Sequence, residues 1–161
     1  GYKVQRKWSL LQRGDPKAPK YISQLMKLQP HNYAAQYDLA TEYRAVGKEQ
    51  KAEKILLEVL AADPYQINAM VLLSAIMEDR VTKKQRNADS QFKERLSVWL
   101  PFLQKNPRSY SAQRLMSRYY EFERNRNKWS EHEKRLDFLE SVNIDEMLDE
   151  HEQPYLTSEP Q

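Results

Sequence analysis

The chain has 161 residues, of which 26 are Lys or Arg and 23 are Asp or Glu, so its formal net charge is only +3. It contains no cysteine, which excludes disulfides, thiol nucleophiles and cysteine-ligated zinc. The chain has only three glycines and is rich in residues that favour helices. It shows no alternating strand pattern and no Asn-Gly or Asp-Gly hairpin turn. The composition therefore predicts an all-α protein.

Charge is divided unevenly between the two ends. Residues 1–30 hold seven Lys or Arg and one acid, whereas residues 136–161 hold eight acids and no Lys or Arg. The basic end has three interpretations: the solvated face of a first helix, a segment next to a membrane anchor upstream of Gly1, or a nucleic-acid contact. Because no run of about 18 apolar residues occurs, a membrane could be reached only through such an upstream anchor. The location stays open between the cytoplasm and a membrane surface.

The first predicted element pair is a shortened one over residues 2–30. Its first helix would pack Trp8, Leu10 and Leu11, and its turn would fall at residues 14–16. The apolar positions of its second helix are Tyr21, Ile22, Leu25, Met26 and Leu28.

The clearest pattern follows in residues 31–64. The segment 33–64 predicts two amphipathic helices that are joined at Gly47 and ended by Asp63-Pro64, because proline cannot continue a helix. The apolar positions are Leu39, Ala40 and Tyr43 in the first helix and Ala52, Ile55, Leu56, Val59 and Leu60 in the second. Such a pair cannot bury its apolar face alone, which predicts a stack of similar pairs.

A family resemblance follows from this segment. Pro30 and Pro64 each close an apolar helix and are 34 residues apart, which is the period of tetratricopeptide repeats. The segment 33–64 resembles that consensus at Ala40, Tyr43, Gly47, Ala52, Leu56 and Pro64, and departs from it at the tryptophan position, Gln36, and mildly at Val59. The resemblance implies an all-α, right-handed solenoid of antiparallel helix pairs, with about seven to eight helices in one domain over residues 1–143. It also implies a protein-interaction scaffold or adaptor within a larger complex.

Residues 65–107 are predicted to form a third repeat with about nine inserted residues, placed in a polar loop over residues 79–91. Pro101 falls inside the second helix and is expected to kink or restart it, because proline lacks a backbone donor. The apolar positions are Ile67, Met70, Val71, Leu72, Ala75 and Ile76, then Phe92, Leu96, Trp99, Phe102 and Leu103.

Residues 108–143 are predicted to form a degenerate, cap-like last pair with its turn at residues 125–127. Its charged positions, Glu131, Glu133, Lys134 and Arg135, predict a solvated face. The apolar positions are Tyr110, Leu115, Met116, Tyr119, Tyr120 and Phe122, then Trp129, Leu136, Phe138 and Leu139.

The acidic segment 144–161 carries one apolar turn, Ile144, Met147 and Leu148. It is either a solvated, partly disordered tail or a docking segment. Its target would be a partner, or the basic N-terminal region of a second copy.

In tetratricopeptide arrays the first helix of each repeat lines a concave groove, and the resemblance implies a partner-binding groove here. Flexible methionines suit apolar contacts and arginines suit carboxylates, so the expected ligand is a peptide or helix with apolar anchors and some acidic residues. The alternative is that the apolar members pack against a neighbouring helix. The groove residues are Tyr37, Thr41, Arg44, Met70, Leu73, Met77, Arg114 and Arg118.

The alternative function is an RNA-associated helical-repeat module. Residues 114–128 are the best local mix of basic and aromatic side chains and resemble half-a-TPR repeats of RNA-processing factors, through the run YYEFE followed by asparagine and tryptophan. Glu121 and Glu123 interrupt the basic and aromatic side chains, and most tyrosines fall on core-facing positions, which disfavours an exposed stacking surface for bases.

The sequence predicts neither catalysis, nor a metal site, nor a cofactor. The histidines are His31, His132 and His151, and no pair has the i, i+4 spacing of a helix-borne zinc site. The three glycines form no phosphate-binding loop, and no serine lies in a nucleophile elbow.

Overall fold

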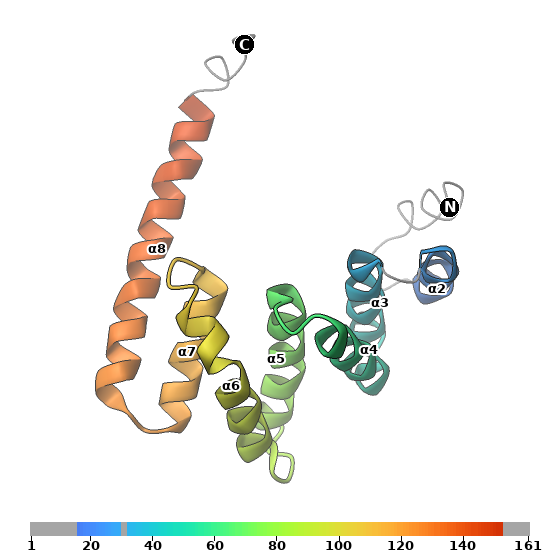
Figure 1. Ribbon diagram of the computed structural model, residues 1–161, viewed down its shortest axis with the longest axis horizontal. Helices are drawn as coiled ribbons and strands as arrows, with labels where there is room; N and C mark the ends of the chain where they lie inside the picture. The colour runs from blue at the N-terminus through green and yellow to red at the C-terminus, as the bar shows by residue number, and fades with distance from the viewer. Residues whose placement is uncertain (1–15, 30–31, 153–161) are drawn as a thin grey trace. The chain divides into compact units, whose positions relative to one another are not determined.

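The computed structural model describes residues 16–29 and 32–152, with side chains described except at residue 18 and residues 143–152. Every regular element within those ranges is an α-helix, so the all-α prediction is confirmed (Figure 1). The first helix predicted around Trp8 lies outside the described residues. The helices are α2 (Ala18–Leu28), α3 (Tyr33–Ala45), α4 (Glu49–Ala62), α5 (Ile67–Thr82), α6 (Ala88–Gln104), α7 (Tyr110–Phe122) and α8 (Arg126–Glu152).

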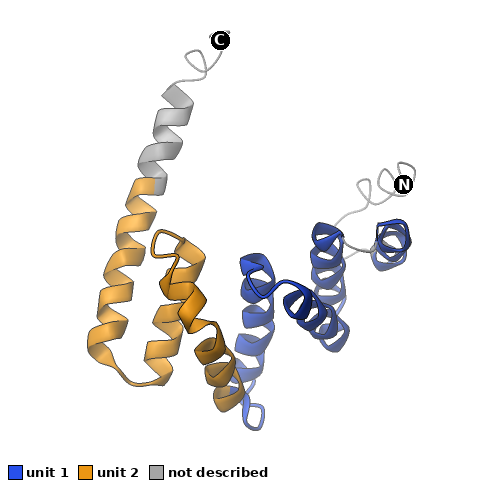
Figure 2. Cartoon of the chain, in the orientation of Figure 1, with its two compact units in different colours: residues 1–88 blue, residues 89–161 orange. Residues whose placement is uncertain are grey.

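The chain divides into two compact units, residues 1–88 and residues 89–161 (Figure 2). Unit 1 contains α2 to α5, and unit 2 contains α7 and α8 together with nearly all of α6. The boundary falls at the start of α6, inside the predicted third repeat.

In unit 1, each helix packs on the next, and α5 contacts α3 as well as α4. The apolar positions predicted for α3 and α4 form much of the core, with Leu39, Ala40 and Leu56 almost fully buried. Leu28 was predicted to pack but is 58% exposed, because it is the last residue of α2 and projects past the packed face. Other buried residues of unit 1 are Ile22, Leu25, Ala35, Ala52, Val59, Ala69, Leu72 and Ile76.

The predicted turn at Gly47 is confirmed. Asn32 caps the start of α3 by accepting a hydrogen bond from the Ala35 N–H at 3.1 Å. At its other end Gly47 has a φ of +81°, a left-handed conformation that glycine adopts without steric cost. The Lys48 N–H then donates to the Tyr43 carbonyl at 2.7 Å and closes the helix end.

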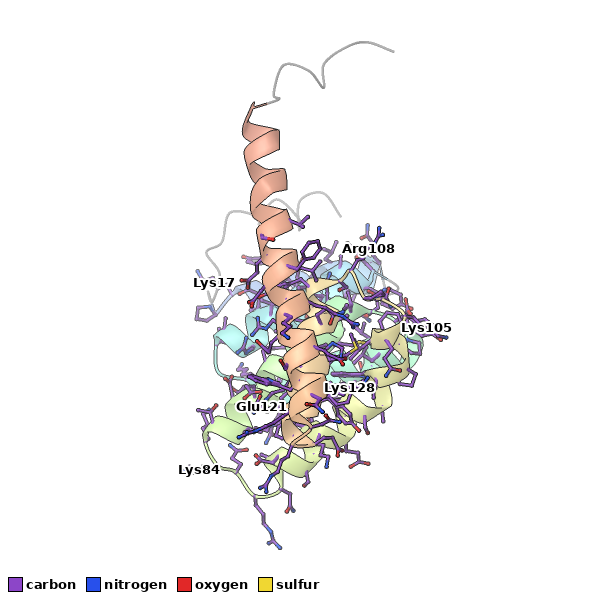
Figure 3. The ribbon with its side chains drawn as sticks, turned by 90° about the vertical axis from the view of Figure 1, so that its left-hand side faces the viewer. Lys17, Lys84, Lys105, Arg108, Glu121 and Lys128 are labelled. Carbon is purple, nitrogen blue, oxygen red and sulfur yellow. The ribbon has the colours of Figure 1, made fainter. Side chains whose placement is uncertain are left out.

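The predicted polar loop over residues 79–91 is wrong, because α5 continues to Thr82 and α6 begins at Ala88. The last turns of α5 carry tertiary ion pairs: Asp79 pairs with Arg44 of α3, and Arg80 pairs with Glu53 of α4. The connection is therefore only residues 83–87. Lys84, on this connection (Figure 3), takes a φ of 53°.

Pro101 does not restart α6, which remains helical to Gln104. Its side chain is exposed, while the predicted core positions Phe92, Leu96, Trp99 and Leu103 are buried. The buried apolar positions of this helix thus continue past the internal proline.

In unit 2, α7 packs on α8, with Leu115, Met116 and Leu136 buried as predicted. Trp129 and Phe138 were predicted to pack but are 40% and 66% exposed. Phe138 comes two residues after the buried Leu136 and so falls on the opposite side of α8, whereas Trp129 lies in the first turn of that helix. The turn lies at residues 123–125 rather than 125–127.

The acidic segment was expected to begin as a tail at residue 144, but α8 has no break there and runs to Glu152. Glu, Met and Leu in this stretch are good helix formers, so the helix propagates. The remainder of that segment lies outside the described residues.

Candidate partner-binding surface

Three of the predicted groove residues share one face of α3. Tyr37, Thr41 and Arg44 follow one another at helical spacing, and each side chain is partly exposed. The Thr41 hydroxyl donates to the Tyr37 carbonyl at 2.9 Å, so its own helix already uses it as a donor. This face, called the α3 face below, keeps an aromatic ring and a guanidinium within reach of solvent.

Arg44 is paired rather than free. Its Nη2 lies 3.1 Å from Asp79 Oδ2 of α5, and the two side chains are 36% and 40% exposed. An ion pair with that exposure contributes little stability, at most about 1 kcal/mol. A ligand carboxylate could therefore replace Asp79 at low cost, but it would have to compete with it.

The three apolar groove residues are buried. Met70, Leu73 and Met77 of α5 are 0%, 1% and 8% exposed. This agrees with the alternative that they pack against neighbouring helices, and they offer no open surface to a ligand.

The last two groove residues lie on α7 in unit 2. Arg114 is exposed, whereas Arg118 Nη1 pairs with Glu121 at 2.9 Å. The Arg118 guanidinium also lies 4.2 Å from the Phe122 ring centroid, a cation–π contact. The predicted groove thus draws residues from both units.

Unit 2 contains a buried polar network that the sequence analysis missed. Gln113 is fully buried, and its Nε2 donates to the Pro107 carbonyl at 2.7 Å. Its Oε1 lies 2.6 Å from His132 Nδ1, so that nitrogen carries the proton and donates. The Tyr120 ring stacks on the imidazole at 5.3 Å and 5°. Ser117 of α7 donates a further hydrogen bond to Glu133 of α8.

His132 is 6% exposed, which the prediction of a solvated face did not anticipate. Burial lowers the pKa of its imidazole from the ordinary value of 6.5, and the charge of Arg135 lowers it further, although Glu131 acts in the opposite direction. A sequence signal did exist, because His132 lies four residues before the buried Leu136 and therefore shares its helix face.

The hydrogen bonds of this network suit a structural role. The partner of His132 Nδ1 is an amide, which unlike a carboxylate cannot stabilise an imidazolium by charge. In the described ranges no group of three or more His, Asp or Glu side chains is arranged to hold a metal ion. The network therefore fits the alignment of α7 with α8.

The aromatic residues on which the RNA alternative depends contact other aromatic rings of unit 2. Tyr119 and Tyr120 meet edge to face at 5.1 Å, and Phe122 meets Phe92 at 5.5 Å. Rings held by such contacts are not free platforms for stacking bases.

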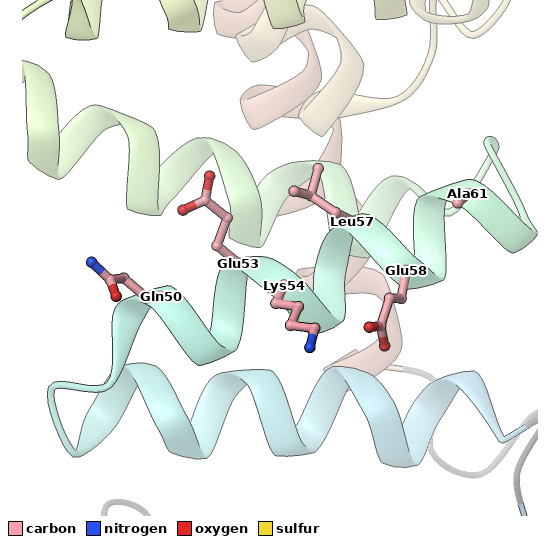
Figure 4. Close-up of a pocket in the computed structure, with 6 residues that line it drawn as sticks. All are labelled: Gln50, Glu53, Lys54, Leu57, Glu58 and Ala61. Atoms are coloured by element: carbon pink, nitrogen blue, oxygen red, sulfur yellow. The ribbon is translucent and has the colours of Figure 1, made fainter.

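A shallow hollow of about 390 Å³ lies on the outer side of α4. Figure 4 shows its side chains projecting from that one helix, with Leu57 between the charged groups of Glu53, Lys54 and Glu58. Glu53 is already held by Arg80, with a 3.1 Å hydrogen bond from Nη1. None of the predicted groove residues lines this hollow.

Along the described part of the chain, no helix combines the length and apolar character needed to cross a membrane. Comparisons of the chain with protein-family models, with curated proteins and with solved structures find no match.

Proposed function

We propose that the chain is a tetratricopeptide-like helical-repeat module that acts as a scaffold or adaptor by binding a partner peptide or helix on the α3 face of unit 1. The observation that carries the proposal is that α5 packs on both helices of the preceding α3–α4 pair. A right-handed solenoid of helix pairs requires this contact between successive repeats.

The exposed chemistry of the α3 face suits a mixed ligand. Tyr37 is a partly exposed aromatic side chain of the kind that anchors interfaces, and Arg44 can exchange Asp79 for a ligand carboxylate. Met70 and Leu73 would then support this face as core residues rather than touch the ligand. The proposed surface is narrower than the groove predicted from the sequence, and a role for Arg114 and Arg118 stays a prediction.

The test first selects peptides that bind the intact chain from a random library. The dissociation constants of these peptides are then measured for the wild-type chain and for the variant Tyr37→Ala. We expect the dissociation constant to rise about tenfold or more, as for loss of an aromatic anchor. Tyr65→Ala is the matched control, because Tyr65 is 67% exposed, belongs to the same unit and lies off α3. The control should leave affinity within about twofold.

Equal affinity of the selected peptides for the wild-type chain and for Tyr37→Ala would overturn the α3 face as the binding site. Absence of any selected peptide, together with binding of a single-stranded RNA that weakens steeply with salt, would favour the RNA alternative.

A further inference from the structure

A second hollow in unit 1 has the character of a ligand pocket. It lies between the start of α2 and the α3–α4 turn and has a volume of about 480 Å³. That volume falls within the range of small-molecule sites, roughly 300–1,000 Å³. It shares no residue with the α3 face, so it is independent of the proposed function.

The pocket is strongly positive. Lys20 of α2 and Lys48 and Lys51 at the start of α4 all line it, and none of its lining residues is acidic. In the described part of the chain, none of the three ammonium groups forms an ion pair. Like charges gathered in this way repel one another until an anion joins them.

Local contacts with Tyr43 position two of these lysines, one through its backbone and one through its side chain. The left-handed φ of Gly47 turns the chain so that the Lys48 N–H donates to the Tyr43 carbonyl at 2.7 Å. The Lys51 Nζ lies 5.6 Å from the Tyr43 ring centroid, a cation–π contact that draws its ammonium towards the pocket wall. A site formed before binding loses less entropy when its ligand arrives.

The rest of the lining is different in character. Pro19, Tyr43 and Val46 supply apolar surface, and the Ser23 hydroxyl adds one further donor. A bare inorganic ion would use the lysines and leave this apolar wall unused.

We infer that this pocket binds a phosphomonoester, with the phosphoryl group on Lys20, Lys48 and Lys51 and the organic part against Pro19, Tyr43 and Val46. Lysine ammonium groups bind a phosphoryl group as point charges, and three of them suit a doubly charged anion better than a singly charged carboxylate. A phosphomonoester near pH 7 carries about −1.5 to −2 charge, so the three lysines more than neutralise it. The phosphomonoester could be a free small molecule or a phosphorylated side chain of a peptide.

The test is an amide chemical-shift titration of the intact chain with phenyl phosphate, with a phosphoserine peptide, with inorganic phosphate and with sodium chloride at equal ionic strength. We expect saturable shifts around Lys20, Lys48 and Lys51, with an organic phosphate binding more tightly than inorganic phosphate. Stronger binding of phenyl phosphate points to a free small molecule, and stronger binding of the peptide points to a phosphorylated side chain. Both outcomes support the pocket.

The decisive variant is K20Q/K48Q/K51Q, which should weaken organic phosphate binding about tenfold or more. The matched control is K83Q/K105Q/K134Q, which removes the same charge from exposed lysines elsewhere and should stay within about twofold of wild type. Equal losses in both variants, shifts reproduced by chloride, or equal affinity for inorganic phosphate would overturn the inference. So would displacement of the organic phosphate by a single-stranded RNA at lower concentration, since the pocket would then belong to a nucleic-acid surface.

Discussion

The two units of this chain hold their helices in register by different means. In unit 1 the ties between α5 and the preceding pair are partly buried ion pairs, Arg44 with Asp79 and Arg80 with Glu53. In unit 2 the ties between α7 and α8 are hydrogen bonds, a buried one from His132 to Gln113 and a partly buried one from Ser117 to Glu133.

This difference assigns different vulnerabilities to the two units. Ion pairs that solvent still reaches contribute little free energy, so the stability of unit 1 rests on its apolar burial. A buried network stabilises only while every member is satisfied, so unit 2 should be sensitive to a single lost partner or to protonation.

The largest expected effect is in the core of unit 1. Met70→Ala should lower the free energy of unfolding by about 3 kcal/mol, because it removes a fully buried side chain and leaves a cavity. Val71→Ala is the control. Val71 follows Met70 in the chain but is 37% exposed, so this substitution should cost less than about 1 kcal/mol. Urea unfolding measures both. Equal losses in the two variants would mean that Met70 is not a core residue.

Next is the network of unit 2. Gln113→Ala should lower the free energy of unfolding by about 2 kcal/mol, because the His132 N–H and the Pro107 carbonyl both lose their partner. Amide hydrogen exchange should show the loss in α7 and α8. Gln104→Ala, at an exposed position, should change stability by no more than about 0.5 kcal/mol. A similar loss of stability in Gln104→Ala would show that the loss in Gln113→Ala does not come from the network.

Smaller effects are expected at the helix ends. Gly47→Ala should cost about 1 kcal/mol through its φ of +81°, since an added Cβ would meet no atom within 4 Å. Lys84 has a φ of 53°, so Lys84→Gly should raise stability by about 0.5 kcal/mol. Lys83 has an ordinary φ of −76°, and Lys83→Gly should give no gain. Thermal unfolding distinguishes the three, and a gain at both lysines would contradict the role assigned to φ.

Acidification should have the smallest effect, because His132 is the one histidine whose side chain the structure describes and the protonation of only this group is expected to change. The lowered pKa keeps folded His132 neutral while the unfolded chain takes up a proton, so stability falls as the pH drops through 6.5. The fall ends once the folded imidazole is protonated too. The protection of the α7 and α8 amides from hydrogen exchange, compared at pH 7.5 and pH 5.5, measures this loss of stability. In His132→Asn the loss between the two pH values should be smaller. An unchanged pH dependence in that variant would assign the effect to other groups.

The pattern of apolar residues was enough to predict helices where propensity and local punctuation agree. The α3–α4 pair is the clearest case, because Gly47 and Pro64 end their helices for reasons of backbone geometry that act within a few residues. The same local reasoning placed Ile22, Leu56, Leu96 and Met116 in the core.

The extent of α5 and the polar core of unit 2 required the tertiary structure. Residues 79–82 were predicted to be loop because most of them are polar, yet they continue α5, where Asp79 and Arg80 pair with Arg44 and Glu53 on other helices. Likewise the sequence analysis placed Phe138 in the core and His132 on a solvated face, whereas α8 exposes Phe138 and buries His132.

The sequence by itself thus determined that this protein is helical and where most of its helices turn, because those properties depend on neighbours along the chain. It did not determine which faces are covered or which charges meet. Lys20 is far in sequence from Lys48 and Lys51, and only the packing of α2 on α3 brings the three lysines to one pocket. Contacts between distant segments depend on the fold as a whole, which is why the tertiary structure alone decided them.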